Sequence, residues 1–231
     1  MSDKTSCSER FCQNHPLLVA HLSAVQRHNR TKNLTSIKEL SAGKVLHIED
    51  SLAVLPEVQS APEGQMADLG SGAGYPGIPL AIVSGRRTTL IEANKKKAQF
   101  LSEFLEEAKL TGLISVAACR SEELARDEAN AFAVITARAV AALPVLLELA
   151  APLLMEGGRF IAMKGKPEKT ELERGEALAD KLNMYQVSAR SYLLTADNKE
   201  LQHCVLVYEK KGQPSLGLPR RPGMAAKRPL A

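Results

Sequence analysis

Short apolar runs alternate with longer amphipathic segments along the chain from Met66 onward. This alternation predicts parallel strands connected by helices, because a parallel strand is covered on both faces whereas a covering helix has a single apolar side. The predicted strands are Met66–Leu69, Thr88–Ile91, Ile114–Ala118, Phe132–Thr136, Arg159–Met163, Val187–Leu194 and Cys204–Tyr208. The predicted helices between them are Ile78–Ser84, Lys95–Lys109, a short helix near Glu122, Leu143–Leu154 and Glu168–Leu182.

Two further helices precede the first predicted strand. Apolar residues recur at helical spacing at Leu17, Leu18, Leu22 and Val25, and a second helical stretch covers Val45–Val58. We expect these helices to form a cap that packs on the main domain.

Four glycines lie within eight positions in the segment Asp68–Gly77, where the first predicted strand leads into a helix. Glycine lacks a Cβ and readily adopts positive φ values, so such a loop lets the backbone approach a nucleotide-like ligand closely. We therefore predict that Gly70, Gly72 and Gly74 contact an adenosine-containing cofactor.

Two cofactor classes fit the glycines. Gly72 to Gly77 satisfies the dinucleotide pattern G-x-G-x-x-G, which leaves a NAD-dependent oxidoreductase as an alternative. The register favours S-adenosylmethionine (SAM), because Asp68 ends the strand and the glycines begin at once with Gly70. SAM has no pyrophosphate that would bind to a helix N-terminus. Its sulfonium and ammonium groups are cations, which the carboxylate of Asp68 would attract.

The number of strands and the chain length define the expected fold. Seven strands ending in a strand pair predict an α/β, doubly wound SAM-dependent methyltransferase fold with a mostly parallel sheet, and 231 residues are too few for the two halves and substrate domain of a dehydrogenase. One domain with additions at its ends is expected. We assign residues 1–62 to an N-terminal helical extension, 63–210 to the methyltransferase domain and 211–231 to a flexible basic tail.

Charge is unevenly distributed along the chain. Lysine and arginine outnumber aspartate and glutamate by 30 to 26, which permits a polyanionic partner without requiring one. No acidic residue follows Glu209, whereas six cations do: Lys210, Lys211, Arg220, Arg221, Lys227 and Arg228. The tail is therefore either a contact for a polyanion or a solubilising terminus.

The four cysteines are Cys7, Cys12, Cys119 and Cys204. They form no C-x-x-C pair and lack the spacing of zinc ligands, so we expect free thiols in a reducing cytoplasm and no metal site. Neither a signal peptide nor a membrane-spanning run is evident, so neither secretion nor membrane insertion is expected.

Polar residues follow the second and third predicted strands, and ligands of doubly wound sheets lie beyond such carboxyl ends. Glu92 comes 24 residues after Asp68, close to the spacing of an acid that accepts hydrogen bonds from ribose hydroxyls. Its alternative role is that of a neighbour to a helix N-cap. Ser121 and Glu122 follow the third strand, where adenine would lie, although they could equally start a helix.

Cations follow the fourth and fifth predicted strands. Arg138 lies nearest to the methyl group that would be transferred, and its small apolar neighbours require it to pair with another group. Lys164 and Lys166 suit a phosphate, although a lysine at a strand end is often only solvated. Lys95–Lys97 begins a helix, where positive charges oppose the helix dipole. These lysines therefore either bind a partner or form a solvated face.

Absent motifs narrow the reaction. The sequence contains no Asn-Pro-Pro-Tyr or Asp-Pro-Pro-Tyr to bind an exocyclic amine, and no Pro-Cys pair to attack a pyrimidine ring. N7 of guanine has an in-plane lone pair and no proton to lose, so direct displacement needs alignment and desolvation but no general base. Arg138 is the single candidate for a catalytic residue.

Several segments are more specific than the glycines alone. They are Asn33-Leu34-Thr35, His47-Ile48-Glu49-Asp50-Ser51-Leu52, DLGSGAGYPGIPLAI, Ile91-Glu92-Ala93-Asn94-Lys95-Lys96-Lys97-Ala98, Arg138-Ala139, Gly157-Gly158, Lys164-Gly165 and Pro219-Arg220-Arg221-Pro222-Gly223. In these segments, which run through nearly the whole chain, the sequence resembles the bacterial glucose-inhibited division protein B family, the guanine-N7 methyltransferases of 16S ribosomal RNA.

The resemblance implies roles for individual residues. It implies SAM contacts at Gly70, Tyr75, Ser121, Glu122 and Arg138, with Glu92 as the ribose acid. It also implies that Asn33, Lys164 and Arg190 face the RNA, where Lys166 and Arg220 are expected to neutralise phosphates.

We therefore expect a monomeric, cytoplasmic, SAM-dependent enzyme that methylates a guanine N7 in 16S ribosomal RNA by direct in-line transfer, without a covalent intermediate. Its partner would be that RNA or the small ribosomal subunit. Two alternatives remain open: an NAD-dependent oxidoreductase, and a non-catalytic ribosome-assembly factor that binds RNA and retains the cofactor pocket.

Overall fold

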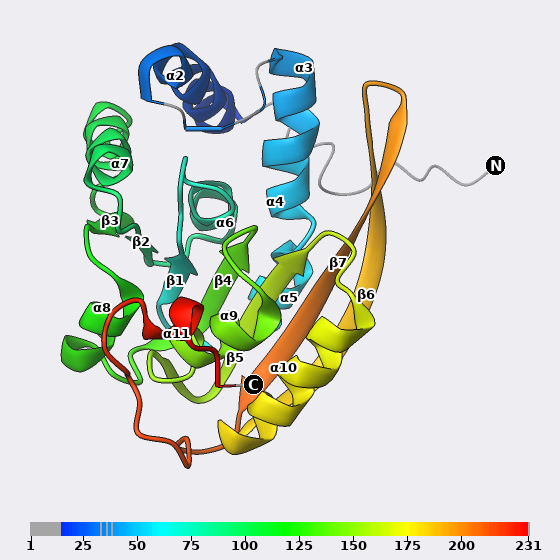
Figure 1. The fold of residues 1–231 in the computed structure, drawn as a ribbon. Coiled ribbons are helices and arrows are strands. Elements are labelled where there is room, and N and C mark those ends of the chain that lie inside the picture. Colours follow the sequence, from blue (N-terminus) through cyan, green and yellow to red (C-terminus); the bar gives the residue numbers. More distant parts are fainter. Residues whose placement is uncertain (1–14, 33, 36, 38, 231) are drawn as a thin grey trace.

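The computed structural model describes residues 15–32, 34–35, 37 and 39–230. Its centre is a seven-stranded sheet with the strand order β3-β2-β1-β4-β5-β7-β6 (Figure 1). Strands β1 to β5 are parallel, and β7 is antiparallel to both β5 and β6. The strands are β1 (Met66–Leu69), β2 (Thr88–Ile91), β3 (Ile114–Ala117), β4 (Phe132–Arg138), β5 (Leu154–Lys164), β6 (Met184–Ala196) and β7 (Lys199–Lys210). The topology confirms the predicted doubly wound α/β fold.

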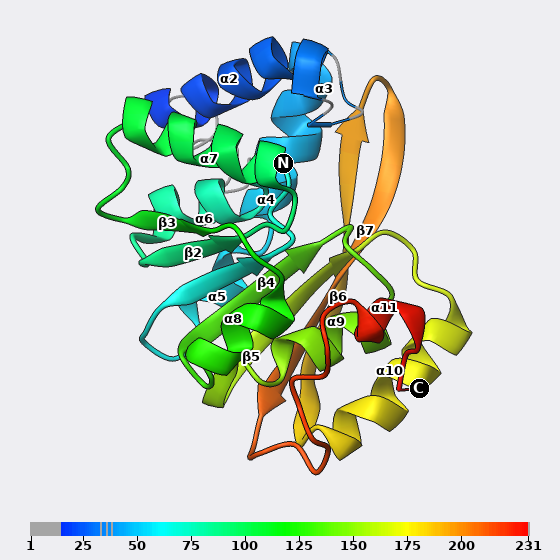
Figure 2. The same ribbon diagram turned by 60° about the vertical axis from the view of Figure 1, so that its left-hand side comes forward.

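Helices cover both faces of the sheet. Successive residues of a strand point to opposite faces, so Met66 belongs to one buried apolar cluster and Ala67 to another. The first face carries α2 (Pro16–Lys32), α4 (Asp50–Leu52), α5 (Leu55–Gln59), α6 (Gly77–Ser84) and α7 (Lys95–Glu107). The second face carries α8 (Ser121–Asp127), α9 (Leu143–Ala150) and α10 (Lys169–Lys181), as Figure 2 shows.

Several short helical elements replace the single helix predicted over Val45–Val58. They are the π-helical turn η1 (Lys44–Glu49), α4 and α5, and the short helix α3 (Leu40–Gly43) precedes them. The wider turn buries His47 and Ile48 against the body of the protein. A π-helical turn within helical structure is rare and often lies at a functional site.

The fifth strand begins earlier than predicted, because the preceding helix is shorter. The predicted helix Leu143–Leu154 ends at Ala150, two residues before Pro152, which has no amide hydrogen to continue the helical bonding. Leu154 then pairs with Phe132 of β4. Apolar residues alone do not distinguish a buried helix end from a buried strand start.

Strands β6 and β7 are longer than predicted and form a hairpin that projects beyond the rest of the sheet (Figure 1). Asp197 and Asn198 make its turn with φ values of 50° and 59°. Two residues with positive φ match the right-handed twist of a tight hairpin, and these residue types tolerate that conformation. Residues 195–203, which lie between the two predicted strands, are largely polar, so they lack the apolar run that identified the other strands.

The C-terminal residues have defined contacts, in contrast to the flexible tail that the sequence predicts. Leu216, Leu218 and Leu230 pack against the cluster on the second face of the sheet. Ser215 donates a hydrogen bond to the carbonyl of Lys181 at the end of α10. The short helix α11 (Met224–Lys227) follows and lies close to α9 in both ribbon views (Figures 1 and 2).

Candidate cofactor and substrate site

The glycine loop connects the end of β1 to α6, and three of its glycines have left-handed backbone conformations. The φ values are 67° at Gly70, 58° at Gly72 and 94° at Gly74. A Cβ on Gly70 would lie 2.8 Å from Cγ2 of Val140, and one on Gly74 would lie 2.5 Å from Cδ1 of Ile78. The loop therefore requires glycine both for its backbone conformation and for its close packing.

Two carboxylates hold this loop from opposite sides. Glu92 accepts the amide hydrogen of Gly72 at 2.8 Å and that of Asn94 at 2.7 Å. Asp68, which is fully buried, accepts hydrogen bonds from Thr136 Oγ1 at 2.8 Å and from the Gly77 amide at 3.2 Å. Burial raises the pKa of Asp68 to about 6 against the opposing effect of these hydrogen bonds.

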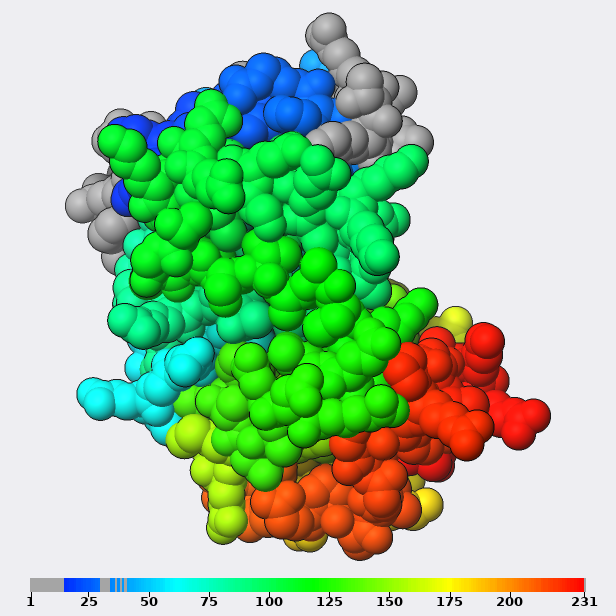
Figure 3. All heavy atoms as spheres, turned by 90° about the vertical axis from the view of Figure 1, so that its left-hand side faces the viewer, coloured from blue at the N-terminus to red at the C-terminus, as the bar shows by residue number. Residues whose placement is uncertain are grey.

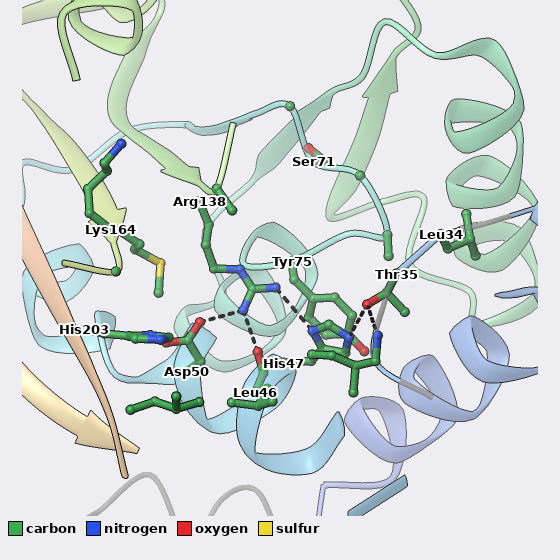
Figure 4. Close-up of a pocket in the computed structure, with 18 of the residues that line it drawn as sticks. Leu34, Thr35, Leu46, His47, Asp50, Ser71, Tyr75, Arg138, Lys164 and His203 are labelled. Carbon is green, nitrogen blue, oxygen red and sulfur yellow. Dashed lines mark hydrogen bonds and ion pairs between the residues drawn. The ribbon is translucent and has the colours of Figure 1, made fainter. Parts of the chain in front are cut away.

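A cavity of about 680 Å³ opens on one side of the loop (Figure 4). Tyr75 and His47 stack inside it with ring centres 4.5 Å apart, and the guanidinium of Arg138 lies 5.5 Å from the centre of the Tyr75 ring. Burial and the charge of Arg138 lower the pKa of His47 to about 4, so its imidazole is neutral at pH 7. We call this space the first cavity.

Asp50 is the central acid of the first cavity. Its oxygens accept hydrogen bonds from Arg138 Nη1 at 2.7 Å, Tyr192 Oη at 2.6 Å and His203 Nδ1 at 2.8 Å. Burial favours the neutral acid, but the hydrogen bond with His203 and the charge of Arg138 outweigh it and lower the pKa of Asp50. Arg138 also donates to the Leu46 carbonyl at 2.9 Å. A buried ionised carboxylate thus fixes the arginine at this site.

A smaller cavity of about 300 Å³ lies on the other side of Gly70. Glu92, Ser121 and Glu122 line it from the ends of β2 and the start of α8. Gly70 and Ala139 line both cavities, so the two spaces adjoin at the carboxyl ends of β1 and β4. We call this space the second cavity.

Most of the predicted cofactor residues gather around these cavities. Those that line at least one of them are Gly70, Gly72, Tyr75, Glu92, Ser121, Glu122 and Arg138. Asp68 and Gly74 do not line either cavity and instead support the loop from behind.

The residues predicted to face RNA have different environments. Lys164 lines the first cavity and is paired with Glu171 at 2.7 Å, whereas Lys166 is exposed. Arg190 binds Glu57 at 2.6 Å, and Arg220 binds the buried Glu148 at 2.7 Å. The prediction for Asn33 lies outside the described residues.

Sequence reasoning assigned no role to several residues of the first cavity. His47, Asp50 and His203 come from η1, α4 and β7, respectively, and only the fold brings them to Arg138. The segment His47–Leu52 was one of the specific matches to the family, which was the available signal for two of them.

The described part of the chain adds two negative findings. It contains no group of three or more His, Cys, Asp and Glu side chains arranged to hold a metal ion. Its helices lack the combination of length and apolar character needed to cross a membrane.

Comparisons with known proteins identify the family of the chain. Residues 14–200 match the family described as GidB, rRNA small subunit methyltransferase G. A ribosomal RNA small subunit methyltransferase G from Desulfitobacterium hafniense is 38% identical over 206 residues, covering 87% of this chain and 83% of that protein. Its counterpart from Alkaliphilus metalliredigens is 33% identical, covering 92% and 89%.

Solved structures support the fold at lower sequence identity. M. jannaschii TYW2, in complex with AdoMet, superimposes with a TM-score of 0.53 at 17% identity over 70% of this chain and 76% of that one. The YcgJ protein of Bacillus subtilis gives 0.55 at 14% identity over 70% and 98%. The match across residues 14–200, together with these curated relatives, shows that the chain belongs to the rRNA small subunit methyltransferase G family.

Proposed function

We propose that this protein transfers the methyl group of SAM to N7 of a guanine in the 16S ribosomal RNA of the small subunit, as a monomer in the cytoplasm. The observation that carries the proposal is the pair of cavities that adjoin at Gly70 and Ala139. One space takes the adenosine of the cofactor, and the other takes the base to be methylated.

The second cavity fits the adenosine half of SAM. The carboxylate of Glu92 accepts two backbone N–H groups and retains lone pairs for ribose hydroxyls, since an ionised carboxylate has about four acceptor positions. Ser121 and Glu122 form the adjoining wall, where the adenine ring would lie. Gly70 and Gly72 let the backbone approach the cofactor between the two cavities.

The first cavity fits a planar base beside the cofactor. When bound, SAM supplies a methyl group on a positively charged sulfur. His47 is neutral at pH 7 and the charge of Arg138 is balanced by Asp50, so the walls add little net positive charge near that sulfur. Guanine presents O6 and N7 along one edge, and a hydrogen bond from Arg138 to O6 would orient this edge while leaving the N7 lone pair free for the methyl group.

No general base is required for the transfer. The N7 lone pair attacks the methyl carbon while the bond from that carbon to sulfur breaks, leaving S-adenosylhomocysteine and a cationic methylated guanine. The residues of the first cavity align the base and exclude water, which are the contributions that such a displacement needs.

Cations at the rim of the first cavity support an RNA substrate. Lys97 and Lys164 line it, and Lys166 is exposed two residues beyond Lys164. These side chains would neutralise phosphates on either side of the target guanine.

A transfer assay tests the proposal directly. Small subunits from cells that lack this protein should accept a labelled methyl group from SAM, and chain cleavage at 7-methylguanosine should give a single position. Subunits that bind the protein but accept no methyl group would favour the assembly factor. Calorimetry with SAM and NAD in parallel separates the oxidoreductase, which would bind NAD alone.

A further inference from the structure

The second cavity has a wall that the cofactor motif does not supply. Gly223, Ala225 and Ala226, near the C-terminus, line it together with Glu92 and Glu122. Figure 3 shows the C-terminal segment in red against the green surface that includes α8. We call residues Gly223–Ala226 the C-terminal wall.

The C-terminal wall is fixed by a buried ion pair just before it. Arg220 donates to both oxygens of Glu148 on α9 at 2.7 Å, and Glu148 is only 3% exposed. Two parallel N–H···O bonds to a carboxylate define both distance and orientation. Ala225 itself is 2% exposed, so the short helix α11 packs tightly behind this anchor.

A second contact joins the wall to a residue predicted to bind the cofactor. The amide of Gly223 donates to Oε1 of Glu122 at 2.7 Å, and the two residues are 101 positions apart in the sequence. Ser121 Oγ donates to the other oxygen of Glu122 at 3.3 Å. The carboxylate of Glu122 is thus held between the first turn of α8 and the C-terminal wall.

We propose that the C-terminal wall is part of the SAM site, where it encloses the adenosine and holds the side chain of Glu122 in position. This inference rests on the proposed function, because it requires the second cavity to take adenosine. The tail would then have a role in cofactor affinity, separate from any contact of its exposed cations with RNA.

The proposal has a reciprocal consequence. If the wall strengthens SAM binding, then bound SAM must stabilise the wall by the same free energy. The amides of residues 219–228 should therefore exchange hydrogen more slowly when SAM is present.

Two substitutions test the wall from different directions. Arg220→Ala removes the anchor and should weaken SAM binding about 10-fold, the effect of losing a charge-assisted contact that orders one wall. Ala226→Trp keeps the anchor, since Ala226 is exposed, and should weaken SAM binding by filling the cavity. Removing Arg220 leaves Glu148 buried without its partner and could unfold the protein. In that case Ala226→Trp still tests the wall.

Arg221→Ala is the matched control. Arg221 is the neighbouring cation, its side chain is exposed, and it lines neither cavity. This variant should bind SAM as the unsubstituted protein does, as measured by calorimetry on the full chain.

The outcomes separate the two proposals. Unchanged SAM affinity in Ala226→Trp and in folded Arg220→Ala, with no slowing of exchange at residues 219–228, would overturn the role of the wall while leaving the methyltransferase in place. Failure of the unsubstituted protein to bind SAM would instead overturn the proposed function.

Discussion

The first and second cavities are built in different ways although they share a wall at Gly70. The second cavity is lined mainly by residues at and just after the carboxyl ends of β1 to β4, together with the C-terminal wall, and Gly70 is its residue from the glycine loop. The first is formed by side chains from distant elements, with Asp50 binding Arg138, Tyr192 and His203. A cofactor common to a fold can use the scaffold itself, whereas a particular substrate needs side chains that the scaffold brings together.

Removing Arg138 should have the largest effect. Arg138→Ala deletes the cation that we propose orients the base and removes the arginine partner of the buried Asp50, so we expect kcat/KM for methyl transfer to fall at least 100-fold. The free energy of unfolding should fall by about 3 kcal/mol, as for other broken buried pairs. Single-turnover assays and urea denaturation measure the two effects. Transfer at the original rate would remove Arg138 from the site.

Removing Glu92 should affect the cofactor more than the substrate. Glu92→Ala loses the acceptor for Gly72 and for the ribose, so SAM affinity should fall about 10-fold to 100-fold, the range for charge-assisted hydrogen bonds. Glu92→Gln, which keeps one carbonyl acceptor, should lose less. Calorimetry gives the dissociation constants, and equal affinity in all three proteins would contradict a ribose contact.

The first cavity should make the stability of the protein sensitive to acid through His47. Folded His47 has a pKa lowered to about 4, whereas an unfolded histidine titrates near 6.5. Stability from neutral His47 is therefore fully present above pH 6.5 and is lost as the pH falls towards 4. His47→Gln should show a shallower loss of stability between pH 7 and pH 5 in denaturant titrations. His21, whose pKa burial lowers to about 3, remains in both proteins and contributes equally. An unchanged slope would show that His47 does not titrate as described.

Replacing Lys166 should have the smallest effect of these substitutions, and its effect should depend on the salt concentration. Lys166→Ala should lower the rate with RNA about two-fold at low salt and reduce the dependence of that rate on salt, because one phosphate contact is lost. SAM affinity, which the proposed function assigns to the second cavity, should change little in the same range of salt concentration. A rate with RNA that is independent of salt would argue against the cationic rim.

Sequence patterns placed residues on both cavities but missed the network around Asp50 in the first. Glu92 follows β2 and Ser121 begins α8, and both line the second cavity as expected from their places after predicted strands. The ends of β5 and of the preceding helix were misjudged around Pro152, because apolar residues alone did not separate helix from strand. The roles of the predicted site residues themselves stay predictions until the variants are measured.

Arg138 shows where the sequence was insufficient. Its apolar neighbours correctly indicated that it must have a partner, but the partner, Asp50, is 88 residues away and belongs to another element. The sequence also did not reveal the partner of Arg220, which was predicted to contact RNA from a flexible basic tail and which the fold pairs with Glu148.

The sequence by itself determined the doubly wound sheet, the glycine loop and the acid that follows β2, because these depend on local periodicity and on backbone conformations that few residue types adopt. Tertiary structure alone decided the network around Asp50 and the contact between Gly223 and Glu122. Such contacts depend on how distant elements pack, and no spacing along the chain encodes that packing.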